Sequence, residues 1–202
     1  NALAGSASGR WLAELLAGID RRRRPPTLAR QNLLDWWGQR NQSAASGDPV
    51  DLVLFPDTFS TWCEPRHVIA ATEIAERLGR TPALAERVCC GRPLISKGFL
   101  DQASAQAVRV IDSLAGWARA DVPIVFLEPS CWSAVRDDLP RLVPSDRRAQ
   151  AEQVAASCVT FEDWAAENID PAALAGSLAA QPVIYHGHCH HKALVGSDAA
   201  VS

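Results

Sequence analysis

The chain contains no methionine, begins with Asn1 and has no apolar run long enough to cross a bilayer. A membrane-spanning helix needs roughly 20 consecutive apolar residues, so we expect no transmembrane segment. The N-terminal stretch places its arginines after its apolar part, which is the reverse of a secretion signal. We therefore expect a cytoplasmic protein, and we interpret the sequence as a fragment of a longer one.

Two further absences limit the classes of function. Charged residues make up 21% of the sequence and the net charge is -3, so nothing favours nucleic acid or an acidic membrane surface as a partner. No G-x-G-x-x-G motif follows an expected strand, so the chain carries no visible site for FAD. Apolar residues at 48% are nevertheless sufficient for a packed core.

Residues 1–49 are predicted to form a helical extension and a linker. Apolar spacing indicates helices over 1–22 and 27–40. The run "RRRRPP" at 21–26 ends the first helix and is expected to be solvated, because proline breaks the helix and four like charges repel each other. Trp36 and Trp37 are expected to pack this extension onto the domain or onto a missing neighbour.

From Val50 onward the pattern is that of an α/β domain, which we place at residues 50–202. Continuous apolar runs predict strands that are buried on both faces of a parallel sheet. These runs lie at 50–57, 122–129 and 181–187. Helical spacing is found at 64–79, 98–120, 130–139, 147–156 and 161–180. The predicted fold class is α/β, with a mainly parallel sheet and flanking helices, preceded by the helical extension.

Six cysteines lie at positions 63, 89, 90, 131, 158 and 189. In a cytosolic protein this number favours metal or redox chemistry over disulfides. Cys131 and Cys189 each follow an expected strand and open an expected helix. The carboxyl ends of parallel strands share one edge of the sheet, where ligands gather, and a helix N-terminus favours a thiolate. Cys158 lies alone in an apolar stretch and is expected to be a buried hydrophobic side chain.

The adjacent cysteines Cys89 and Cys90 are followed by Gly91, which permits a tight turn. Adjacent cysteines are too strained for an ordinary disulfide, and structural zinc sites use longer spacers between their ligands. An iron–sulfur cluster offers several iron atoms, so neighbouring thiolates can each bind one. We therefore predict that Cys89, Cys90, Cys131 and Cys189 are the metal ligands of one cluster at the sheet edge.

Four histidines surround Cys189, namely His186, His188, His190 and His191. Imidazole binds metals, transfers protons and donates N–H groups to sulfur. We expect His186 to be a core histidine on the third strand and His191 to face solvent. His188 and His190 flank the predicted ligand, and we expect them to tune the cluster from outside its ligand set.

Two charged residues lie beside the predicted ligands. Lys192 follows the histidines and would add positive charge that stabilises an anionic cluster or a substrate carboxylate. Glu128 precedes Cys131 and would either accept a proton or cap the helix that begins there.

The motifs "CCGRP" at 89–93, "EPSC" at 128–131 and "YHGHCHHK" at 185–192 together resemble the cysteine-rich domain that is often called the CCG domain. That domain occurs in heterodisulfide reductase, in the iron–sulfur subunits of glycolate oxidase and lactate utilisation, and in FAD-linked dehydrogenases. The segments "LFPDTF", "GRPLISKGFLDQA" and "HCHHKALVG" are most similar to the last group. The resemblance covers about residues 50–196.

The resemblance implies that residues 50–202 hold the first half of this domain and the start of the second half, truncated at the C-terminus. Cys89 and Cys90 match the first motif, Cys131 matches the cysteine downstream of it, and Cys189 matches the opening cysteine of the second half.

Three departures from the family pattern affect the cluster type. The sequence "WSA" after Cys131 lacks the second cysteine of the CxxC in heterodisulfide reductase. The second CCG motif would lie beyond Ser202. Cys63, which we expect to enter a helix, is an irregular match for a cysteine near the first strand. A [4Fe–4S] cluster is therefore expected in place of the five-cysteine non-cubane cluster.

The function that this resemblance implies is electron transfer in an FAD-linked enzyme that oxidises a 2-hydroxy acid such as D-lactate, glycolate or 2-hydroxyglutarate. FAD would bind in the missing upstream part, and the partners would be upstream FAD and ferredoxin-like domains or subunits and an electron acceptor. The fragment alone is expected to be inactive. Two alternatives remain open: a site that reduces a terminal acceptor, as in heterodisulfide reductase, and a zinc-stabilised structural or docking domain.

Overall fold

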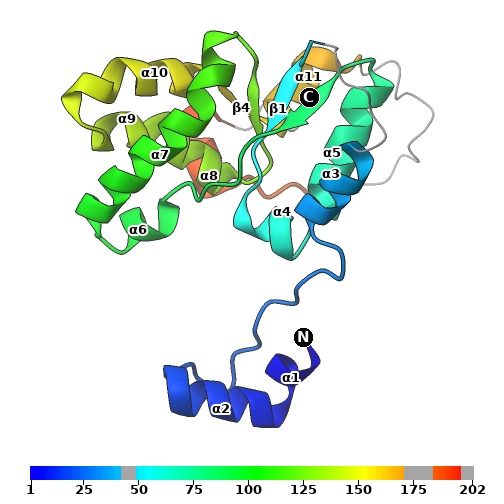
Figure 1. The fold of residues 1–202 in the computed structure, drawn as a ribbon, viewed down its shortest axis with the longest axis vertical. Helices are drawn as coiled ribbons and strands as arrows, with labels where there is room; N and C mark the ends of the chain where they lie inside the picture. Colours follow the sequence, from blue (N-terminus) through cyan, green and yellow to red (C-terminus); the bar gives the residue numbers. More distant parts are fainter. Residues whose placement is uncertain (42–48, 171–183, 197–202) are drawn as a thin grey trace.

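The computed structural model of the chain describes residues 1–41, 49–170 and 184–196. Within these ranges it contains one four-stranded sheet, in which all pairings are parallel and the strand order is β2-β1-β3-β4 (Figure 1). The strands are β1 Leu52–Leu54, β2 Pro82–Leu84, β3 Ile124–Phe126 and β4 Cys158–Thr160. The predicted α/β class with a parallel sheet and flanking helices is confirmed.

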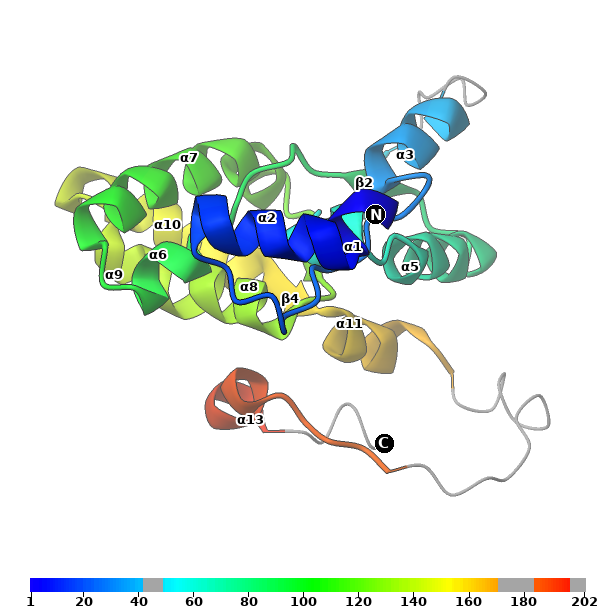
Figure 2. The same ribbon diagram turned by 90° about the horizontal axis from the view of Figure 1, so that it is seen from below.

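Helices cover both faces of the sheet (Figure 2). One face carries α6 Arg92–Ser96, α7 Leu100–Arg119, α8 Pro129–Ser133, α9 Leu139–Leu142 and α10 Arg148–Ser157. The other carries α3 Leu33–Asn41, α5 Arg66–Arg77 and α11 Phe161–Asn168. Successive side chains of a strand point to opposite faces, so Val53 packs in the first core and Leu52 and Leu54 pack in the second.

The long helices follow the apolar spacing of the sequence. In α7 one continuous face is buried, with Ala103, Ala107, Val110, Ile111, Leu114, Ala115 and Ala118. In α5 the buried residues recur at the same spacing, and the chain then turns at Gly79, where φ is +72°. The predicted helices at 64–79, 98–120 and 147–156 are confirmed within their boundaries by a few residues.

Two strands and two helices differ from the prediction. β2 and β4 were not predicted, because each has only three residues and β4 runs directly from α10 into α11 without a turn signal. The helix at 130–139 is divided into α8, a π-helix at Ala134–Asp138 and α9. The helix predicted to reach 180 ends at Asn168, and residues 171–180 lie outside the described part.

The third predicted strand, at 181–187, is not found where the structure describes it. Residues 184–187 form no strand, and Ile184 is 97% exposed. Residues 181–183 lie outside the described residues. The outer position beside β3 is taken by β4, so the apolar run at 184 has no strand to pair with.

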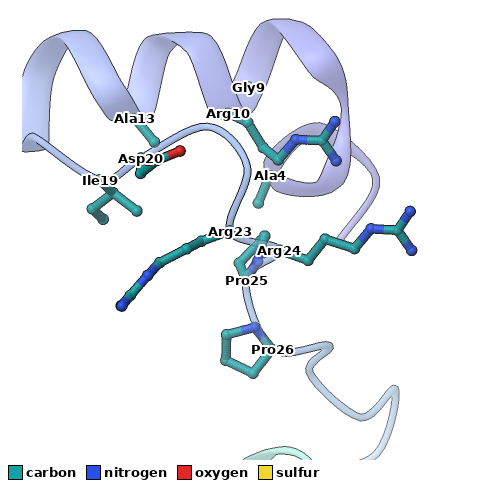
Figure 3. A pocket seen from close by; sticks show the side chains of 10 residues that line it. All are labelled: Ala4, Gly9, Arg10, Ala13, Ile19, Asp20, Arg23, Arg24, Pro25 and Pro26. Atoms are coloured by element: carbon teal, nitrogen blue, oxygen red, sulfur yellow. The ribbon is translucent and has the colours of Figure 1, made fainter.

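The extension begins with an arm that stands away from the body (Figure 1). It consists of α1 Ala2–Gly5 and α2 Ala7–Ala17, which are separated by Ser6, the N-cap of α2. The helix predicted over 1–22 is therefore interrupted. The run 21–24 is exposed, which confirms that it is solvated. A cavity of about 370 Å³ lies inside the arm, with Arg10, Arg23 and Arg24 on its wall, and it involves none of the cysteines (Figure 3).

The second part of the extension belongs to the packed body. Leu33 in α3 is fully buried in the core that also contains Leu52 and Val68, and Trp36 and Trp37 pack against that core. The two tryptophans therefore dock α3 onto the domain. The division of the chain at residue 49 stays a prediction. In the described ranges no helix has both the length and the apolar character needed to cross a membrane.

Candidate cysteine site at the edge of the sheet

Two of the predicted ligands meet at the carboxyl edge of the sheet. The Sγ atoms of Cys90 and Cys131 are 2.9 Å apart, and the thiol of Cys90 donates a hydrogen bond to Cys131. Cys90 follows β2, while Cys131 follows β3 and lies in the first turn of α8, as predicted. Both side chains are buried, at 4% and 9% exposed. Residues 41 positions apart in sequence are therefore in direct contact.

Cys89 extends this pair to a chain of three thiols. Its thiol donates to Cys90, and Cys90 in turn donates to Cys131. Because the protonated form makes these bonds, the pKa of Cys89 is raised and that of Cys90 is raised to about 12. The three sulfurs therefore hold their protons to one another in the metal-free protein, and metal binding would release those protons.

The main chain of the turn after Cys90 also points at the sulfurs. Gly91 has φ of +84°, the left-handed conformation that glycine adopts readily. The N–H of Gly91 donates to Cys89 and the N–H of Arg92 donates to Cys90. Such donors stabilise negative charge on a sulfur, so the predicted role of Gly91 in aiming the two cysteines is borne out.

Two side chains to which the sequence pattern assigned no role fix this turn. The amide Nε2 of Gln106 in α7 donates to the carbonyl of Cys89 at 2.7 Å. The guanidinium of Arg92 donates to the carbonyl of Ser130, next to Cys131, at 3.2 Å. The only signal in the sequence was their polarity beside apolar neighbours, and this does not reveal a partner far along the chain.

Glu128 caps α8, as one of the two expectations stated. Its carboxylate accepts hydrogen bonds from the main-chain N–H and the hydroxyl of Ser130. A groove of about 430 Å³ lies beside it at the ends of β1, β3 and β4, lined in part by Asp57, Leu127 and Phe161. Glu128 therefore stands between the cysteine site and this groove.

Cys189 is the first residue of α13, Cys189–Val195, as predicted, although no strand precedes it in residues 184–188. Helix α13 packs against α8, which carries Cys131 (Figure 2). Cys189 itself is exposed. The N-cap of α13 is His188, whose Nδ1 accepts from the N–H of His190 at 3.3 Å.

The expectations for two histidines were wrong in opposite senses. His191 was expected to face solvent, but it is 3% exposed, with its ring 5.3 Å from that of Trp132. Its Nε2 lies 3.5 Å from both Thr160 Oγ1 and Asp163 Oδ2. His186 was expected in the core but is exposed. The cause is that residues 184–187 form no strand, while helical geometry after Cys189 turns His191 toward α8.

The remaining cysteines lie outside this group. Cys63 follows the last residue of α4, Thr58–Trp62, so it ends a helix and does not enter one as expected. Cys158 is fully buried and donates to the carbonyl of Val154 at 3.1 Å. Burial raises the pKa of the Cys158 thiol. The expectation that Cys158 is a buried hydrophobic side chain is confirmed.

The donors present suit a thiophilic group. Cys89, Cys90 and Cys131 offer sulfur alone, which soft metals and iron–sulfur clusters prefer and magnesium or calcium do not. Among the described residues, no three histidine, cysteine, aspartate or glutamate side chains are already arranged to hold a metal ion. Ligation would therefore require the thiols to lose their protons and their S–H···S bonds.

Comparison with known proteins gives two kinds of relative. The chain is 24% identical over 188 residues to one subunit of the anaerobic glycerol-3-phosphate dehydrogenase of Escherichia coli (strain K12), which covers 90% of the chain and 45% of that protein. It is 32% identical over 87 residues to the D-2-hydroxyglutarate dehydrogenase of Pseudomonas putida KT2440, which covers 43% of the chain and 9% of that protein. The chain thus spans less than half the length of these curated relatives.

No family model and no solved structure matches the chain. The similarity is therefore to a dehydrogenase and to a subunit of another dehydrogenase, and the resemblance to the CCG domain stays a prediction.

Proposed function

We propose that this chain is an iron–sulfur electron-transfer part of a dehydrogenase. The observation that carries the proposal is the contact of Cys90 with Cys131 at the carboxyl edge of the sheet, with Cys89 hydrogen-bonded to the pair. Both kinds of relative are named as dehydrogenases or their subunits, which supports a redox role. The proposal thus joins a sulfur-rich site to a redox setting.

Cys89, Cys90, Cys131 and Cys189 would hold a [4Fe–4S] cluster, which passes electrons one at a time when bound. The main-chain N–H groups of residues 91 and 92 donate to two of these sulfurs and would stabilise their negative charge. The burial of Cys90 and Cys131 keeps water from that side of the site. Helix α13 packs on α8 and so brings Cys189 to the neighbourhood of Cys131.

For the parent enzyme we propose a flavoprotein that oxidises a 2-hydroxy acid. Glycerol-3-phosphate and D-2-hydroxyglutarate, the compounds in the names of the relatives, each carry a secondary hydroxyl group and an anionic group. FAD, a ferredoxin-like segment and the electron acceptor would be supplied by other domains or subunits, and we propose a cytoplasmic location. The chain's share of the reaction is to bind, bury and hydrogen-bond the cluster, while the redox chemistry belongs to the cofactor.

Anaerobic reconstitution with ferrous iron and sulfide tests the proposal. We expect broad visible absorption and about four iron atoms per chain. Cys90→Ser and Cys131→Ser should lose most of this absorption, whereas Cys63→Ser, which changes a cysteine outside the group, should retain it. A colourless protein that binds stoichiometric zinc would overturn the proposal and favour a zinc-stabilised domain.

A further inference from the structure

The arginine that follows the CCG sequence contacts both sides of the cysteine site. Its main-chain N–H donates to the sulfur of Cys90. Its side chain crosses to the helix that carries Cys131, where Nε donates to the carbonyl of Ser130 at 3.2 Å. Ser130 directly precedes Cys131. One residue therefore binds the main chain beside one buried thiol and the sulfur of the other.

The side chain of Arg92 has three partners on the Cys131 side. Besides the Ser130 carbonyl, its Nη2 donates to Ser133 Oγ at 2.8 Å and to Asp138 Oδ2 at 2.7 Å. Arg92 is 17% exposed and Asp138 is 28% exposed, so water screens this ion pair only in part. The planar, forked guanidinium can satisfy several acceptors at fixed angles, whereas a lysine ammonium cannot do so from one position.

The π-helix explains how Asp138 reaches this place. Residues Ala134–Asp138 follow α8 directly and form one π-helical turn, with Asp138 at its end. A π-turn contains one residue more than an α-helical turn, so it rotates the following side chains by about 100° relative to a regular helix. The turn therefore sets the direction in which Asp138 meets Arg92. Such turns are often found at functional sites.

We propose that Arg92 is the positioning residue of the cysteine site: it holds the turn with Cys89 and Cys90 at a fixed place against the helix with Cys131. This inference rests on the proposed function for its biological meaning, since the position of the sulfurs matters because they bind one group together. Arg92 does not ligate and moves no proton. It acts through the geometry of Cys90 and Cys131.

The test measures the thiol geometry without any cluster. In a Cys89→Ser background, the metal-free protein is treated with a diazene oxidant. The oxidant takes up the two thiol hydrogens as it becomes a hydrazine, and a Cys90–Cys131 disulfide forms. Peptide mapping gives the rate. Because an error of about 1 Å in position can cost up to about 100-fold in the rate of an oriented reaction, we expect Arg92→Gln to slow this step by at least about 10-fold.

Arg141→Gln is the matched control. Arg141 also pairs with an aspartate of the π-helix, Asp137, at 2.9 Å, but it is 74% exposed and touches neither cysteine segment. It removes the same charge from the same region and should leave the rate within about twofold of the parent, as expected for an exposed pair. All rates are compared well below the melting temperature, where circular dichroism shows each variant to be folded.

Three further variants keep the inference falsifiable if Arg92→Gln does not fold. Ser133→Ala and Asp138→Asn each weaken one of the three contacts, and each should slow the step by a smaller factor. Arg92→Lys retains the charge without the fork and should rescue only part of the rate. The double variant Arg92→Gln/Asp138→Asn should be no slower than Arg92→Gln alone, because the two residues act as one unit.

Equal rates in the parent, Arg92→Gln and Arg141→Gln would overturn the inference, and so would unchanged rates in both single-contact variants. Failure of the unmutated chain to take up iron and sulfide would instead remove the proposed function, and the rate comparison would still decide the role of Arg92. If the cluster does bind, Arg92→Gln should also shift its midpoint potential while Arg141→Gln should not.

Discussion

His191 is the residue that we expect to hold α13, and with it Cys189, against the body. Its ring is 3% exposed and lies 5.3 Å from the ring of Trp132, which itself is 1% exposed. Its Nε2 is 3.5 Å from Thr160 Oγ1 and from Asp163 Oδ2. Truncation by His191→Ala removes the ring contact, the burial and both polar contacts at once.

The size of the effect can be worked out from these contacts. An aromatic pair of this kind contributes about 1 kcal/mol beyond its burial. Burial of the small apolar part of the ring contributes about 1 kcal/mol. The polar contacts at 3.5 Å are long, so we assign them about 0.5 kcal/mol together. Undocking of α13 should therefore become about 2.5 kcal/mol easier, which is a factor of about 60 in its equilibrium.

Hydrogen exchange followed by mass spectrometry measures this equilibrium directly. The amides of residues 189–195 should exchange about 60-fold faster in His191→Ala, while those of α7 should be unchanged, because only the docking of α13 is affected. His190→Ala is the control, since His190 is exposed and keeps its main-chain N–H bond to His188. His191→Phe retains a ring for Trp132 and should show a smaller increase. Equal exchange of α13 in His191→Ala and His190→Ala would refute this account of the docking.

Three other predictions concern the body and its thiols. Leu33→Ala should lower the free energy of unfolding by about 2–5 kcal/mol in urea titrations, because Leu33 is fully buried; a loss below about 0.5 kcal/mol would show that α3 does not belong to the folded body. Gly91→Ala should cost about 1–2 kcal/mol, measured by thermal melting, because φ is +84° while the added Cβ would meet only Gln106 Cγ at an ordinary 3.5 Å; an unchanged melting temperature would contradict the strain. Iodoacetamide at mildly alkaline pH should alkylate Cys189 at least about 100-fold faster than Cys158, because Cys158 is fully buried and its pKa is raised by burial; rapid labelling of Cys158 in the folded chain would contradict its core position.

The parts of the fold that the sequence predicted are those with a long regular pattern. Helix α7 buries one face over 20 residues, so its spacing is unambiguous, and β1 and β3 are continuous apolar runs. β2 and β4 have three residues each, which is too short for any period to be visible. The π-turn at 134–138 has no pattern of its own, because it results from how the segment fits between α8 and α9.

For the candidate site, the sequence predicted the meeting of Cys90 with Cys131, because the parallel sheet places the ends of its strands at one edge. It did not predict the partners of Arg92, which lie 38 to 46 residues away and depend on the packing of α6 against the π-turn. The histidines failed for a related reason. Which of His186 and His191 is buried depends on whether their segment is strand or helix, and the apolar run at 181–187 favoured strand.

The way the thiols are brought together bears on how such a protein matures. The two sulfurs in contact come from stretches 41 residues apart, one reached after β2 and the other after β3. Pairing of β1 with both of these strands has to precede their meeting, and such non-local pairing is the slow stage of acquiring a native structure. A nascent polypeptide on the ribosome would thus carry the reactive groups separately. Insertion of an inorganic core during biogenesis would be a late, post-translational event that uses an already assembled scaffold.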